Sequence, residues 1–171
     1  LSEKGRQVKT FHWHLAFVPF LRGFNAEIRE NFVKLAQQFG VEYLGLEYVF
    51  ASLLFEDRYQ ASQEGFQERL EYIGLTLTDF EALRKAARAF IEYSFSELSE
   101  YLEDTRLVGF SCSHYQLSGS LLMCSKIKEA YPQVQTVVGG KDCAGAFAEE
   151  LLSNTDVVDF VGTGECEATM A

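Results

Sequence analysis

Three short, mostly apolar runs alternate with helical patterns in the last third of the chain. The runs lie at residues 107–110, 134–138 and 157–161. Between them, apolar residues recur every three or four positions, and the first such stretch stops just before Pro132, as helices do. Strand-length runs separated by helices are typical of a parallel sheet that is buried on both faces. The pattern predicts a βαβαβ α/β domain over residues 105–171.

The middle of the chain, residues 23–104, has the period of helices instead. Its apolar stripes are Phe24, Ile28, Phe32, Leu35 and Phe39; Leu44, Tyr48, Ala51, Leu54 and Phe55; Phe66, Leu70 and Ile73; and Phe80, Leu83, Ala87, Phe90, Ile91, Ser94, Leu98 and Tyr101. Thr78 and Glu81 have the spacing of a capping box, which predicts the start of the last and longest helix. This block is longer than an ordinary crossover between parallel strands, so it is expected to be a helical insertion or subdomain.

Residues 1–22 are expected to lead into the α/β domain. Val8–Leu15 alternates between an apolar face and a face that carries His12 and His14, which predicts the first visible strand. Two histidines at this spacing either bind a metal or lie at the surface, and the lack of a third ligand nearby favours the surface. Leu1–Gly5 resembles the last turn of a helix, so the chain is expected to start within a domain.

Composition excludes several classes of protein. The chain has 171 residues, 47% of them hydrophobic, which suits one domain of ordinary size with a core. A net charge of −10 makes nucleic acid an unsuitable partner. Neither a membrane span nor a signal peptide is present in the pattern. The four cysteines form no CxxC pair, which indicates reduced thiols in a cytoplasmic protein rather than a metal site.

Small residues follow each predicted strand. Ser111 and Ser113 follow the first strand and Gly139-Gly140 the second, and Gly162 and Gly164 follow the third. Ligands of parallel sheets bind at the carboxyl ends of the strands. Glycine there allows a planar ligand or a phosphate to approach the backbone closely. The sequence therefore predicts a wide, flat recess at this edge.

Several familiar kinds of site are missing. There is no GxGxxG and no GxxxxGK[ST], which argues against a flavin or nucleotide domain. Cys112 and His114 could form a thiolate–imidazole couple only if the loop turns sharply. The aromatic stripe Phe90, Phe95 and Tyr101 either lines a ligand pocket or belongs to the core, and its helical spacing favours the core.

These motifs resemble the cobalamin-binding domains of radical S-adenosylmethionine (SAM) enzymes, and most of all the maturases of ribosomally made peptide natural products (RiPPs). The resemblance rests on Val108-Gly109-Phe110-Ser111, Gln116, Val138-Gly139-Gly140, Val158 to Glu165 and, in the helical block, Glu47 to Phe55. It implies a flavodoxin-like, Rossmann-like sheet with cobalamin over the carboxyl ends of its strands. The cofactor-binding residues that it implies are Ser111, Cys112, Ser113, Gln116, Gly139, Gly140, Gly162, Gly164 and Glu165.

The resemblance also implies partners outside this sequence. In the family, a C-terminal radical SAM barrel holds SAM and a 4Fe-4S cluster and acts on a peptide substrate, as in methyltransferase-type maturases. That barrel's CxxxCxxC motif does not occur here, and neither does DxHxxG, which would supply a histidine ligand to cobalt. The chain is therefore expected to be a cobalamin-binding fragment with no catalytic motif and no metal ligand of its own.

Two further expectations concern alternatives and assembly. The rival function is a non-enzymatic, flavodoxin-like interaction or sensor module that binds a partner, such as a basic peptide, through the helical block. The family's first strand has no counterpart, which would leave the sheet open beside Leu107–Phe110. Either Val8–Leu15 closes this gap or two copies pair as a homodimer.

Overall fold

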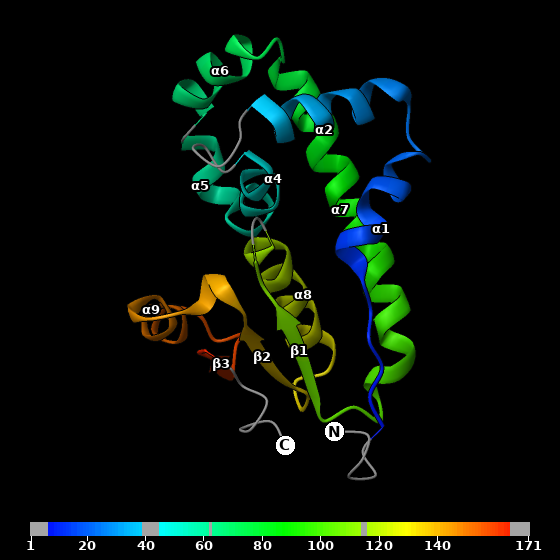
Figure 1. Ribbon diagram of the computed structural model, residues 1–171, viewed down its shortest axis with the longest axis vertical. Coiled ribbons are helices and arrows are strands. Elements are labelled where there is room, and N and C mark those ends of the chain that lie inside the picture. The colour runs from blue at the N-terminus through cyan, green and yellow to red at the C-terminus, as the bar shows by residue number, and fades with distance from the viewer. Residues whose placement is uncertain (1–6, 39–44, 62, 114–115, 165–171) are drawn as a thin grey trace.

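The chain forms a mixed α/β structure in which a small parallel sheet lies below a block of helices (Figure 1). The computed structural model describes residues 7–38, 45–61, 63–113 and 116–164. The first half contains helices α1 (Trp13–Leu21), α2 (Ala26–Gln38), α4 (Gly45–Leu54), α5 (Glu56–Ala61), α6 (Gln63–Tyr72) and α7 (Leu77–Leu102). The second half contains β1 (Leu107–Ser111), α8 (Leu117–Ala130), β2 (Gln135–Gly139), the short 3-10 helix η2 (Lys141–Cys143), α9 (Ala146–Asn154) and β3 (Phe160–Gly162).

The predicted N-terminal strand is wrong. Residues 7–12 have no regular structure, and helix α1 begins at Trp13. The ring of Phe11 stacks on Trp13 at 4.9 Å and meets Tyr101 of α7 at 5.8 Å, and Trp13 Nε1 donates a hydrogen bond to Glu97. Aromatic packing on α7 therefore holds this segment, and Val8–Leu15 does not pair with β1.

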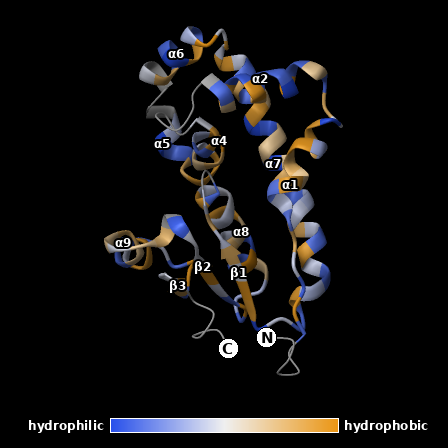
Figure 2. Ribbon diagram, viewed as in Figure 1, coloured by the Kyte–Doolittle hydropathy of each residue, from blue (hydrophilic) through white to orange (hydrophobic). Residues whose placement is uncertain are grey.

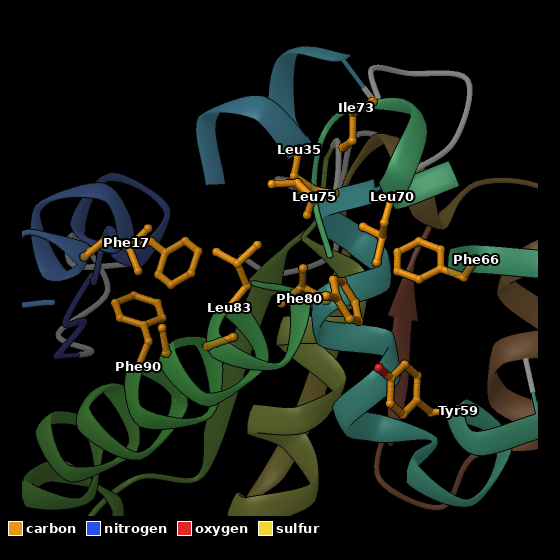
Figure 3. Close-up of a cluster of buried hydrophobic side chains, with 14 residues drawn as sticks. Phe17, Leu35, Tyr59, Phe66, Leu70, Ile73, Leu75, Phe80, Leu83 and Phe90 are labelled. Atoms are coloured by element: carbon orange, nitrogen blue, oxygen red, sulfur yellow. The ribbon is translucent and has the colours of Figure 1, made fainter. Parts of the chain in front are cut away.

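The helical block was predicted correctly in outline. Its core contains buried side chains from α1, α2, α4, α5, α6 and α7 (Figure 3). Phe90 is 6% exposed and packs between the rings of Phe17 and Phe20, at 4.8 and 5.2 Å. The core interpretation of the aromatic stripe is confirmed for Phe90, whereas Tyr101 is 41% exposed.

The capping box of α7 lies two residues earlier than predicted. The hydroxyl of Thr76 accepts from the backbone N–H of Asp79, and the Asp79 carboxylate accepts from the backbone N–H of Thr76. Aspartate replaces the expected glutamate at the third helical position. The predicted partner, Glu81, instead binds Arg84 and Tyr59.

The sheet has the order β1-β2-β3 with all strands parallel, as the alternation of strands and helices predicts. Strand β2 is shifted by one residue from the predicted run, and β3 begins at Phe160 rather than at Val157. Because consecutive strands are neighbours and crossovers are right-handed, both connecting helices lie on one face of the sheet. Val138 and Val161 pack there with Leu121 of α8 and Leu151 of α9.

The opposite face was expected to be buried, and it is not covered by the residues that the structure describes. Its side chains alternate with the buried ones along each strand. Leu107 is 40% and Phe160 48% exposed, and Val137 between them is half-buried. In Figure 2 much of β1 is coloured hydrophobic, and α8 lies behind it.

Candidate functional site

One row of small residues crosses the carboxyl edge of the sheet. Ser111 of β1 is the register partner of Gly139 of β2, and Gly139 is the register partner of Gly162 of β3. All three belong to the open face. The prediction that three adjacent strand ends are built from small residues is therefore confirmed.

Helix α4 of the helical block packs at this same edge. The carboxylate of Glu47 accepts a hydrogen bond from the backbone N–H of Ser118, 2.5 Å away in the first turn of α8. Gly119 of α8 faces the ring of Phe50 of α4, and a Cβ built there would lie 3.7 Å from the ring, at ordinary contact distance. Figure 1 shows α4 beside the start of α8, at the end toward which β1 points.

The turn after β1 brings four predicted residues together. Ser111 is exposed, Cys112 is buried and Ser113 is half-buried. The side-chain oxygen of Gln116 accepts from the backbone N–H of Ser113, which closes the turn into α8. His114 lies outside the described residues, so its pairing with Cys112 is not placed.

Cys112 is a protonated thiol at neutral pH. Burial raises its pKa to about 12, although the hydrogen bond from its Sγ to Ser120 Oγ at 3.2 Å acts the other way. Burial likewise raises the pKa of Cys124 to about 12. Because thiolates are the reactive form of cysteine, neither thiol is an activated nucleophile in this environment.

The backbone geometry at the end of β2 requires glycine at residue 140. Gly140 has φ of +108°, a conformation that favours glycine, and a Cβ there would collide with the backbone of Cys112, whose nitrogen would be 2.9 Å away. A Cβ at Gly139 would lie 3.3 Å from the carbonyl oxygen of Gly162. The backbone of the neighbouring strand ends therefore leaves little room for a side chain at residues 139 and 140. A bulky substitution at residue 140 would test the fold rather than binding.

The third strand end is more open. Gly162 is half-buried, and Gly164 is exposed with φ of +74° and no atom within 4 Å of a Cβ built there. Glu165 lies outside the described residues.

Sequence reasoning missed Glu47 as a site residue. One signal was readable: Glu47 is the only charged residue between Glu42 and Glu56, in an otherwise apolar helix. A single acid in such a stretch is either buried with a partner or functional. Only the tertiary contact with α8 shows which backbone group it meets.

The two histidines of the N-terminal segment are exposed, and their ring centroids lie 5.9 Å apart. Within the described residues, no group of three or more histidine, cysteine, aspartate or glutamate side chains is placed to hold a metal ion. Over the same residues, no helix combines the length and apolar character needed to cross a bilayer.

No protein-family model matches the chain, and neither a curated protein nor a solved structure matches it.

Proposed function

We propose that this chain is a cobalamin-binding module with a flavodoxin-like sheet, working in the cytoplasm as part of a radical SAM enzyme that modifies a peptide. The observation that carries the proposal is the Ser111–Gly139–Gly162 row. A planar macrocycle needs a broad edge without large side chains, and this row provides one across three strands.

The residues at this edge suit a corrinoid held by shape and hydrogen bonds. They include the hydroxyls of Ser111 and Ser113 and the carboxylate of Glu47. The described residues of this edge carry hydroxyl, thiol and amide side chains, and no imidazole is among them. Such a site would orient the cofactor and keep water away.

Cobalamin would supply the chemistry as a methyl carrier. The proposed partners are a radical SAM barrel, with its own SAM and 4Fe-4S cluster, and the peptide substrate. This chain would contribute binding and orientation.

Titration with hydroxocobalamin tests the proposal. Wild-type protein should shift the visible spectrum of the corrinoid and retain it on gel filtration. Ser111→Trp should abolish retention, because the indole would fill the row of small residues. Leu107→Trp is the matched control on the same strand and face, at the opposite end, and should bind normally. An unchanged wild-type spectrum without retention would refute the proposed function.

A second candidate is a partner-binding module. Tyr72 at the end of α6 is 91% exposed and Phe55 is 49% exposed, on a chain of net charge −10. Exposed aromatics on an acidic surface suit a basic peptide. Capture of basic peptides that is lost in Tyr72→Ala, without corrinoid binding, would favour this alternative.

A further inference from the structure

The carboxylate of Glu47 is only half satisfied. One oxygen, Oε1, accepts from the backbone N–H of Ser118, whereas Oε2 is buried and has no hydrogen-bond partner. Buried polar atoms in native proteins are nearly always hydrogen-bonded, and each exception needs an explanation. A carboxylate oxygen left alone in this way is costly.

Three donor side chains of α7 and α8 are engaged elsewhere. Ser120 Oγ donates to the carbonyl of Gln116, and the guanidinium of Arg84 donates to Ser52 and Glu81. Lys126 pairs with Glu92. These three groups therefore do not satisfy the second oxygen of Glu47, which is buried.

The position of Glu47 ties this oxygen to the candidate site. Its carboxylate lies at the start of α8, where the helix dipole favours a negative charge. It is also close enough to Cys112, the residue that follows β1, to contribute to the raised pKa of that thiol. The half-satisfied acceptor thus lies where the helical block meets the carboxyl edge of the sheet.

A purely structural cap does not need this arrangement. One oxygen is enough to accept from Ser118, and the amide oxygen of glutamine, which has the same length as glutamate, could supply it. The second oxygen adds a buried acceptor that the described residues do not use.

We propose that Glu47 is a ligand-binding residue whose Oε2 accepts a hydrogen bond from an N–H donor of the molecule bound at this edge. This assignment rests on the proposed function: the donor is one of the primary carboxamides on the periphery of the corrin ring. Hydrogen bonds to a charged acceptor are stronger than neutral ones. Glu47 would thereby link the helical block to the cofactor.

Glu47→Gln is the decisive variant, because its amide oxygen can still accept from Ser118. Its ligand-free melting temperature should stay the same or rise, while its dissociation constant for hydroxocobalamin should increase by about tenfold or more. Glu27→Gln, at an exposed position of α2, makes the same change in charge and should leave both quantities nearly unchanged. Equal affinity of Glu47→Gln and wild type would overturn the role of Glu47 alone.

Binding of a modified corrinoid gives a second measurement, which would not change if Glu47 had only a structural role. Hydroxocobalamin whose carboxamides have been hydrolysed to carboxylates lacks the donors and repels Glu47. Wild type should discriminate strongly against it, and Glu47→Gln should discriminate less. Equal discrimination by both proteins would reject the proposal, and failure of wild type to bind either corrinoid would reject the proposed function together with it.

Discussion

The guanidinium carbon of Arg84 lies 4.0 Å from the centroid of the Tyr59 ring, and both side chains hydrogen-bond the carboxylate of Glu81. Arg84 is 8% exposed and also donates from Nε to Ser52 Oγ at 2.9 Å and from a terminal nitrogen to the Ser52 carbonyl at 3.0 Å. A stacked arginine with its donors paired fastens α4 and α5 to α7. Helix α4 is thereby fixed in the position from which Glu47 reaches α8.

Replacing Arg84 should weaken the packing of α4 on α7. Arg84→Ala should lower the free energy of unfolding by about 3 kcal/mol, because it leaves Glu81 and buried Ser52 without their partner. Arg88→Ala is the control, since its side chain is 54% exposed and pairs with Glu56 at the surface, and it should cost less than about 1 kcal/mol. Urea unfolding measures both, and equal losses would contradict the structural role of Arg84.

Ser94 and Ser52 should respond in opposite directions to alanine. Ser94 is 1% exposed and its hydroxyl has no hydrogen-bond partner, whereas Ser52 donates to Val49 and accepts from Arg84. Ser94→Ala should raise the unfolding free energy by about 1 kcal/mol by removing an unpaired buried group, and Ser52→Ala should lower it by at least as much. Thermal unfolding of the two variants checks this, and a destabilised Ser94→Ala would show that its hydroxyl has a partner.

Asp159 should make stability depend on pH. Burial opposes its ionisation, but hydrogen bonds from Lys128 at 2.5 Å and from the backbone N–H of Thr136 at 2.6 Å outweigh burial and lower its pKa below 3.8. A lowered pKa in the folded state means that the stabilisation is present above the unfolded value and is lost as pH falls through the folded value.

Asp159→Asn should therefore be less stable than wild type at neutral pH, and the gap should narrow as the pH falls below the ordinary aspartate pKa. Asp156→Asn, in the same connection and exposed, should match wild type at neutral and at acidic pH. Urea unfolding at the two pH values measures the gap, and a gap that persists in acid would show that shape rather than charge is responsible.

The outer edge of β1 favours pairing with a second copy. The N–H of Cys112 donates to Gly139 and the carbonyl of Arg106 accepts from Gln135, so the backbone groups of the alternate residues Leu107, Gly109 and Ser111 point away from β2. Because residues 7–12 pack on α7, closure by Val8–Leu15 does not occur, and we propose a homodimer through this edge.

Light scattering on two variants tests this assembly. Leu107→Pro removes an outward N–H at the first residue of the strand while keeping the ladder to β2, and it should be monomeric. Leu107→Ala keeps that donor and should remain dimeric. A wild-type protein that is a monodisperse monomer at high concentration would refute the dimer.

Local patterns by themselves determined most of the elements. The long helix α7, the strand β1 and the end of α8 before Pro132 follow from periods and breakers that act over a few neighbouring residues. The adjacency of the three small strand ends also followed, because parallel strands with short crossovers become neighbours.

Tertiary contacts decided the structure of segments whose local sequence pattern fits more than one structure. The alternation in Val8–Leu15 gives a strand only if a neighbouring strand forms backbone hydrogen bonds with it. Here Phe11 and Trp13 pack on α7 instead, through Tyr101 and Glu97. The choice between two threonines as the cap of α7 depended on Asp79 rather than on the Glu81 that Arg84 recruits.

The candidate site shows the same division. Glycine after a strand indicates that another group comes close to the backbone. Whether that group is a ligand or another backbone depends on how the sheet packs. At Gly140 the backbone of Cys112 is the close neighbour. Glu47 is more than sixty residues from the start of α8 in the sequence. Their contact exists because the helical block folds back onto the sheet, and such long-range packing has no signature in the local spacing of residues.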